Sequence, residues 1–129
     1  MKISKFPPES DDGYIEYKLK LINIEPDKLE KLTTQMIWRL HEGKGFTKYF
    51  LGLSDDGTPT GLNPKLMKES QDNLYKMTNN LPIKCSIHLL NTYIGIEGEI
   101  KEYVIKQINK YQEIKYDFDI RLSTETIIC

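Results

Sequence analysis

Residues 48–62 read Lys-Tyr-Phe-Leu-Gly-Leu-Ser-Asp-Asp-Gly-Thr-Pro-Thr-Gly-Leu, and the predicted fold is built around them. Tyr49 to Leu53 is an aromatic and aliphatic run typical of a β-strand. Asp55-Asp56-Gly57 indicates a turn, because its glycine can adopt positive φ without strain. Thr58 to Leu62 is then the returning strand, with Pro59 at an edge or strand end because proline has no N–H to donate. The stretch therefore predicts a β-hairpin.

A strand and a helix are predicted before the hairpin. Residues 14–22 alternate between apolar and charged side chains, which indicates a half-buried strand with Glu16 on its polar face. A helix opens at Pro26, either with proline at its first position or through a capping box of Asp27 and Glu30. It ends at the glycines of residues 43–45. Its core stripe is Leu29, Leu32, Met36 and Leu40.

A second helix and further strands are predicted after the hairpin. Asn63 followed by Pro64 is a strong helix start, and the apolar spacing continues to Leu81. Residues 83–93 resemble a strand, with Cys85 on its apolar face and His88 on the opposite one. Residues 99–111 fit either a helix or a strand. Residues 117–122 alternate like a strand.

This order of elements predicts an α+β fold of the ferredoxin-like βαββαβ type. We expect an antiparallel sheet with two helices on one face and one or two extra C-terminal elements. Residues 1–13, which contain two prolines and a run of polar residues, are predicted to be a flexible lead-in. Residues 14–129 would form a single domain, in which the assignment of residues 98–129 is the least determined.

Composition excludes several classes of protein. The 129 residues carry 18 basic and 19 acidic side chains, a net charge of −1, which argues against a broadly basic nucleic-acid surface. Two cysteines do not make a disulfide framework, so we expect a reduced, cytoplasmic setting. No apolar run approaches the roughly 20 residues that span a bilayer.

No constellation of residues in the sequence indicates catalysis, and we expect a non-enzymatic chain with no catalytic, cofactor or metal site. The phosphate-loop pattern G-x-x-x-x-G-K-[S/T] does not occur. His41 and His88 lack cysteine or carboxylate neighbours at metal-ligand spacing. Cys85 and His88, three residues apart on a strand, would point to opposite faces. The pair Asp55-Asp56 is interpreted as turn chemistry rather than an acid–base pair.

Three stretches together resemble the region that precedes the GTPase domain in the GTP-binding-protein-one and -two family of translational GTPases, which are related to elongation factor one-alpha. They are residues 13–21 (GYIEYKLKL), 34–45 (TQMIWRLHEGKG) and 52–62 (GLSDDGTPTGL). The resemblance covers the first half of the chain, and the second half agrees in general layout only. It implies an accessory or interaction domain that contacts a translational GTPase core, the ribosome, RNA or a partner protein, with no contact to a membrane.

The same resemblance bears on cofactors and on the C-terminal residues. Asp119-Ile120-Arg121 stands where the family's chain leads into the GTPase domain. The chain is then either a separate domain-sized protein or a piece of a longer one, and the apolar, uncapped residues Ile127-Ile128-Cys129 favour the piece. GTP and magnesium would then be bound only by a GTPase domain that follows in that parent protein.

Four residues of the first predicted helix are candidate partner contacts. They match the family pattern but lie off the core stripe: Gln35, Trp38, Arg39 and Glu42. Tryptophan and arginine are over-represented at interface hot spots. The alternative is that this set packs the helix onto the sheet.

Two other functions stay open. The G-x-x-D-D-G-x-x-x-G-L pattern of residues 52–62 is also similar to Schlafen-type AlbA domains, which bind or process nucleic acid. A stand-alone decoy that competes for the GTPase's partner is the other alternative.

Overall fold

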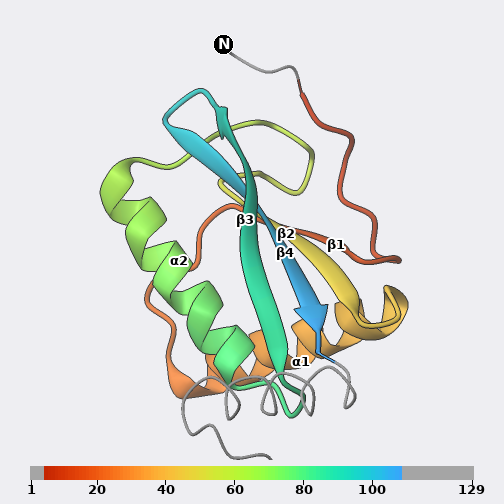
Figure 1. Ribbon diagram of the computed structural model, residues 1–129. Coiled ribbons are helices and arrows are strands. Elements are labelled where there is room, and N and C mark those ends of the chain that lie inside the picture. The colour runs from red at the N-terminus through yellow and green to blue at the C-terminus, as the bar shows by residue number, and fades with distance from the viewer. Residues whose placement is uncertain (1–4, 109–129) are drawn as a thin grey trace, which may run out of the picture.

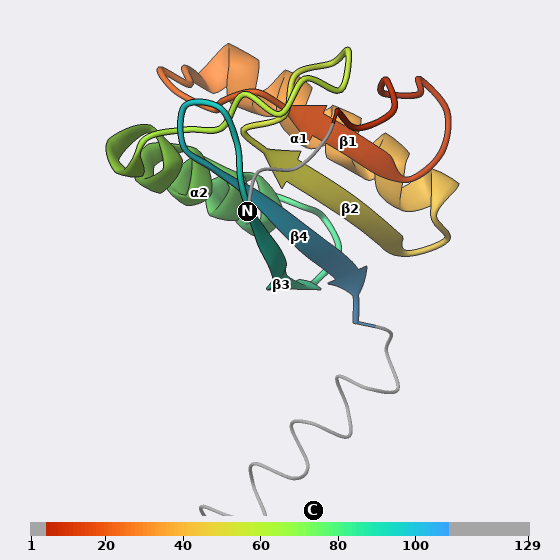
Figure 2. The ribbon, with the colours of Figure 1, turned by 90° about the horizontal axis from the view of Figure 1, so that it is seen from above.

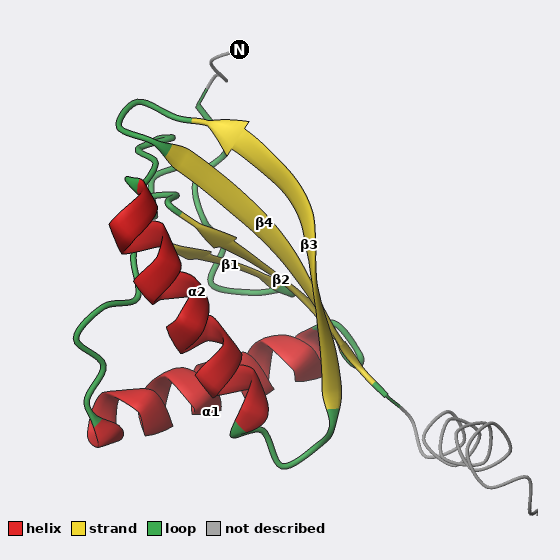
Figure 3. Ribbon diagram, turned by 60° about the vertical axis from the view of Figure 1, so that its left-hand side comes forward, coloured by secondary structure: helices red, strands yellow, loops and turns green. Residues whose placement is uncertain are grey.

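The structure is a computed structural model that describes residues 5–108. Six elements follow one another along the chain (Figure 1): β1 (Ile15–Lys18), α1 (Pro26–Glu42), β2 (Phe46–Leu51), α2 (Pro64–Asn79), β3 (Cys85–Ile94) and β4 (Glu99–Gln107). The strands form one four-stranded sheet in the order β1-β2-β4-β3. Both helices lie on the same face of this sheet (Figures 2 and 3). The predicted α+β class, with a ferredoxin-like outline, is therefore confirmed.

The sheet is mixed, whereas the sequence predicted an antiparallel one. β1 pairs with β2 in parallel, while β4 is antiparallel to both of its neighbours, β2 and β3. The parallel pair arises because α1 carries the chain back to the end of the sheet where β1 began, as in any strand–helix–strand crossover. The last two strands form the hairpin of the fold, which places the antiparallel turn at residues 95–98.

The returning strand predicted over residues 58–62 is absent from the sheet. Only Leu62 makes a bridge, with Glu99 of β4, and Gly61 donates its N–H to the carbonyl of Gly52 at 2.8 Å. Gly52 and Gly61 both have positive φ, at 92° and 83°, so the backbone turns out of strand geometry at both ends of the loop. The turn at Asp55 and Asp56 is present as predicted. Residues 52–62 are thus a loop, called the glycine loop below.

The predicted helix starts are confirmed, and the ambiguous segment after residue 98 is a strand. Pro26 is the first residue of α1, with Glu25 as an N-cap that makes no side-chain hydrogen bond. The side chain of Asn63 caps α2, accepting from the N–H of Leu66 at 2.8 Å. β4 lies between β2 and β3, and its alternate residues Tyr103 and Ile105 are fully buried. The predicted strand at residues 117–122 and the first four residues of the predicted lead-in lie outside the described residues.

The main core lies between the helices and the sheet. It joins one face of each helix to alternate residues of the central strands, and its buried members are Leu21, Leu32, Met36, Leu40, Tyr49, Leu51, Leu62, Met67, Leu74, Met77, Tyr103 and Ile105. The predicted stripe of α1 is confirmed. Two side-chain hydrogen bonds join α2 to the chain after β1. Asn73 donates to the carbonyl of Leu21 at 2.8 Å, and the hydroxyl of Ser70 accepts from the N–H of Leu21 at 3.0 Å.

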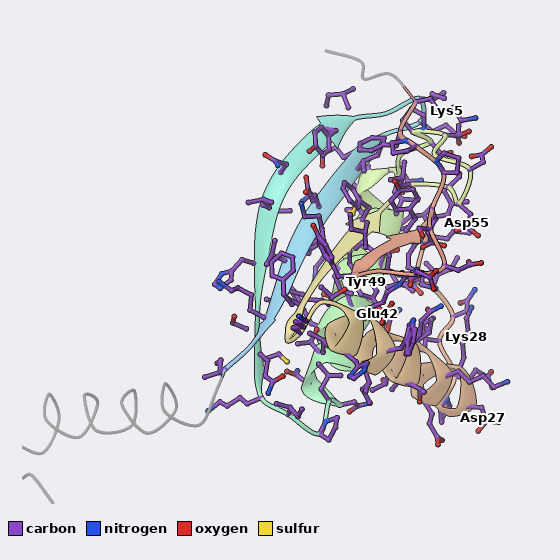
Figure 4. The ribbon with its side chains drawn as sticks, turned by 90° about the vertical axis from the view of Figure 1, so that its right-hand side faces the viewer. Lys5, Asp27, Lys28, Glu42, Tyr49 and Asp55 are labelled. Atoms are coloured by element: carbon purple, nitrogen blue, oxygen red, sulfur yellow. The ribbon has the colours of Figure 1, made fainter. Side chains whose placement is uncertain are left out.

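A second, smaller core lies on the opposite face of the sheet. Phe50 alternates with Tyr49 and Leu51 along β2 and therefore points away from the helices. It packs with buried Tyr17, Leu53 and Ile100, and with the partly buried Phe6, Ile15 and Tyr93. Phe6 belongs to residues 5–13, called the strap below, which lie against this face and past Asp55 (Figure 4). The sequence predicted a flexible lead-in at this place.

Candidate functional site

The C-terminal half of α1 carries all four predicted contact residues. The helix ends at Glu42, where the N–H of Gly43 donates to the carbonyl of Arg39 at 3.0 Å and the N–H of Lys44 donates to that of His41 at 3.1 Å. Trp38, at 48% exposure, faces solvent, whereas Arg39 is 4% exposed and faces the strap and β1. Gln35 and Glu42 are half-buried. The structure therefore separates the four residues into an outward side and an inward side.

Arg39 holds the strap to the body of the domain. Its Nε donates to Glu16 Oε1 at 2.7 Å. Its Nη2 donates to the carbonyl of Ser10 at 2.8 Å, and its Nη1 to those of Asp12 and Gly13 at 3.2 and 2.9 Å. These bonds use the donors of the guanidinium fork on the chain's own backbone. Arg39 thus acts on the fold of this region, and direct contact between Arg39 and a partner remains a prediction.

Glu16 lies on the face of β1 opposite to Tyr17, as the alternating pattern predicted, but the helix layer covers this face. It is 2% exposed and points to the helix layer, since it is paired across the sheet with Tyr49. Arg39 supplies the opposite charge that a buried carboxylate requires, and Lys18 lies 3.3 Å from Glu16 Oε2. The prediction that Glu16 faces solvent is therefore wrong. The buried arginine of α1 is the reason.

A second carboxylate, that of Glu9 in the strap, shares this charged cluster. Glu9 Oε2 accepts from the N–H of Tyr17 at 2.6 Å and lies 3.8 Å from Arg39 Nη2. Burial, reinforced by the nearby carboxylates of Glu16 and Asp55, raises the pKa of Glu9 to about 7, although the Tyr17 hydrogen bond opposes the shift. Burial is the main cause, and the repulsion that would arise if Glu9 and Glu16 were both ionised adds to it.

The outward side of α1 presents an aromatic surface beside a groove. The ring of Trp38 lies 6.1 Å from that of His41. Next to it, a groove of about 390 Å³ is bounded by the end of α1 and by the segment between α2 and β3, and its lining residues are Ile37, Leu40, His41, Lys44, Gly45, Leu81, Pro82, Ile83 and Gln107. Ile37 and Ile83 are 41% and 45% exposed. We call Trp38 and this groove together the α1 surface. The sequence showed Trp38 but not the groove, whose walls come from segments far apart in the chain.

The residues that could take part in catalysis or metal binding lie apart from one another in the described part of the chain. Among residues 5–108, no group of three or more histidine, cysteine and carboxylate side chains could hold a metal ion. Asp56 Oδ1 accepts from the N–H of Thr58 at 2.9 Å, which is the turn role predicted for it. Cys85 is paired with Gln107 and His88 with Val104, so the two side chains point to opposite faces of β3. Burial raises the pKa of the Cys85 thiol, which disfavours the thiolate.

None of the helices in the described part of the chain is long and apolar enough to cross a bilayer.

Comparison with known proteins relates the chain to GTP-binding proteins. It is 45% identical over 75 residues to GTP-binding protein 2 of Mus musculus and of Homo sapiens, which covers 58% of this chain and 12% of each relative. It is 39% identical over 75 residues to uncharacterized protein R625 of Acanthamoeba polyphaga mimivirus, covering 57% of this chain and 40% of the viral one. GTP-binding protein 1 of Xenopus laevis is 26% identical over 103 residues, which cover 78% of this chain and 15% of the relative. No protein-family model matches the chain, and no solved structure matches it.

Proposed function

We propose that this chain is a non-catalytic interaction domain that binds the GTPase core of a translational GTPase through the α1 surface. The observation that carries the proposal is the exposure of Trp38 beside an apolar groove, in a chain similar to GTP-binding protein 2. The similarity covers 12% of that relative. The 129 residues contain no phosphate-loop pattern, so we assign nucleotide binding to the partner and not to this domain.

The α1 surface has the composition of a binding site for an apolar side chain with acidic neighbours. Trp38 is a large, rigid ring, and such rings supply contact area at low entropic cost. Ile37 and Ile83 widen the apolar area on either side of the groove. His41 and Lys44 lie at the same groove, and Lys44 gives it a positive charge. A partner segment with an apolar anchor and acidic flanks fits both features.

The inward residues have a different role in this proposal. Glu42 Oε1 accepts from the N–H of Gly13 at 3.1 Å, and Arg39 bonds to the strap. Both therefore hold the end of α1 in position, so that Trp38 and the half-buried Gln35 lie where a partner can reach them. We propose direct contact for Trp38 and Gln35 and a positioning role for Arg39 and Glu42.

Binding by matched variants tests the proposal. The fluorescently labelled chain is titrated with the GTPase portion of human GTP-binding protein 2, and anisotropy is recorded. Trp38→Ala should weaken binding by at least about tenfold, as expected for a hot-spot residue. Ile96→Ala is the control, because Ile96 is 62% exposed and lies in the turn between β3 and β4, away from α1. Absence of binding, or equal weakening by both variants, would contradict the proposal.

A role in translation forms part of the same proposal and has its own test. Co-sedimentation with purified ribosomes, with and without the GTPase portion, should show the chain in the pellet only when the GTPase portion is present. Binding of the chain alone to RNA, with an affinity that falls steeply with salt, would instead favour a nucleic-acid-binding domain.

A further inference from the structure

The strap occupies the face of the sheet opposite the helices in the manner of a bound peptide. The ring of Phe6 sits against two aromatic rings in edge-to-face contacts, with centroid distances of 5.4 Å to Phe50 and 5.7 Å to Tyr93. Tyr17 completes the wall, since its ring lies 5.6 Å from that of Phe50. Edge-to-face pairs of this kind add to the free energy gained from burial alone. The sheet thus provides a pocket for one aromatic side chain.

The backbone of the strap is recognised as well as its side chains. The glycine loop accepts two hydrogen bonds from it, Phe6 N–H to the carbonyl of Gly57 and Glu9 N–H to that of Asp55, both at 2.8 Å. The hydroxyl of Tyr17 donates to the carbonyl of Pro7 at 2.9 Å. The two prolines between Phe6 and Glu9 have no N–H, so this part of the strap has no backbone donor that needs a partner. Main-chain bonds combined with side-chain pockets are the usual means of binding an extended peptide.

The far end of this site is built for a hydrogen-bond acceptor. Glu9 Oε2 receives the N–H of Tyr17 at 2.6 Å and faces Arg39 at 3.8 Å. Arg39 also donates to the carbonyl of Ser10, the next strap residue, at 2.8 Å. The side chain oxygen of a glutamate or a glutamine satisfies the same donors.

Gly57 makes room for the strap. A Cβ at this position would lie 2.0 Å from the carbonyl oxygen of Phe6 and 2.8 Å from that of Pro7. A side chain would therefore exclude the strap from the loop. Beside the strap, a cleft of about 260 Å³ is bounded by Pro7, Pro8 and the start of β1.

We propose that this face is a peptide-binding site for segments of the form aromatic–Pro–Pro–Glu or aromatic–Pro–Pro–Gln, and that residues 6–9 are its intramolecular occupant. A partner protein that carries such a segment displaces the strap and takes its place. Gly13, with φ of 91°, joins the strap to β1 and supplies the hinge for release. The prolines favour an extended form before binding, which lowers the entropic cost for an incoming segment. This site is separate from the α1 surface.

Peptide binding to the full chain tests the proposal. The probe is a labelled peptide with the sequence Lys-Phe-Pro-Pro-Glu-Ser, and its control has alanine in place of phenylalanine. The Phe6→Ala chain, whose own strap is weakened, should bind the probe at least about tenfold more tightly than the wild type does. The control peptide should bind that variant at least about tenfold more weakly than the probe. Equal binding of both peptides to a variant with native circular dichroism would overturn the proposal.

A measurement on the wild-type chain keeps the test independent of the variant's stability. A tether of a few residues corresponds to an effective concentration in the millimolar range, so the probe at several millimolar should compete with the strap. In nuclear magnetic resonance spectra, the amide signals of Tyr17 and Glu9 should then shift, and those of α2 should not. No shift at either residue would overturn the proposal. A dimer whose share grows with protein concentration would also overturn it, because the occupant would then be the strap of a second copy.

Discussion

Replacing Arg39 by methionine is the strongest test of the charged cluster that joins the strap, β1 and α1. Methionine keeps much of the length of the side chain and removes the charge and every donor. The change breaks the 2.7 Å bond to Glu16 and the bonds to three strap carbonyls. It also leaves Glu16, at 2% exposure, with Lys18 at 3.3 Å as its remaining charged partner in this region.

The size of the stability loss in Arg39→Met follows from the burial of both Arg39 and Glu16. Removing one partner of a buried ion pair costs about 3–5 kcal/mol, because the other charge is left uncompensated. Such a loss is about a fifth or more of the total stability of about 5–15 kcal/mol that a domain has. We therefore expect Arg39→Met to lower the free energy of unfolding by about 3–5 kcal/mol, measured by urea denaturation. The unfolding free energy of Arg39→Lys should lie between those of the wild type and Arg39→Met, since lysine keeps the charge and loses the planar fork.

Two controls decide the interpretation. Lys31→Met removes an exposed charge from the same helix and should change stability by less than about 0.5 kcal/mol. In the double variant Glu16→Leu with Arg39→Met, the buried carboxylate that Arg39 neutralises is removed together with the arginine, so the combined loss should be clearly smaller than the sum of the two single losses. A loss below about 1 kcal/mol for Arg39→Met, or strict additivity in the double variant, would refute the reasoning.

Three further predictions concern single side chains. The unfolding free energy should fall as pH rises from 4.5 to about 7, because folded Glu9 keeps a proton that the unfolded chain has lost, and Glu9→Gln should flatten this dependence in urea titrations at several pH values. Asn63→Ala should cost about 1 kcal/mol through loss of the helix cap, whereas Glu25→Ala, at a cap with no side-chain bond, should cost almost nothing in thermal unfolding. Tyr93→Phe should cost about 1.5–3 kcal/mol in urea denaturation, since its hydroxyl donates to the carboxylate of Glu102 at 2.6 Å.

The elements that depend on local chemistry could be predicted from the sequence. The starts of both helices follow from proline at the first position, and the stripe of α1 follows from helical spacing. The partners of each strand could not be predicted in the same way. Pairing of β2 with β1 and β4 depends on contacts between residues far apart in the chain. The glycine loop has the sequence of a hairpin, and the positive φ of Gly52 and Gly61 that turns it into a loop is a property of the folded backbone.

The candidate site was predicted in part for a related reason. Trp38 lies off the core stripe and is exposed, as its position on the helix indicates. Arg39 lies off the same stripe and is nevertheless buried, because the strap covers it. A segment rich in proline and acidic residues gives no periodic signal, so nothing in the sequence shows that it returns to the sheet. The burial of Glu16 could not be predicted from its strand either, because its ion-pair partner Arg39 comes from α1.

The central position of β4 has a consequence for how the protein folds during synthesis. β4 is the last of the described strands to be made, yet it lies between β2 and β3 and contacts both cores through Ile100 and Tyr103. Until residue 107 has left the ribosome, the chain offers only β1 and β2 as adjacent strands, and two strands alone are marginal in water. The helices meanwhile expose their apolar faces. We expect this chain to fold late in synthesis and in one step, and to depend on chaperones until β4 is inserted.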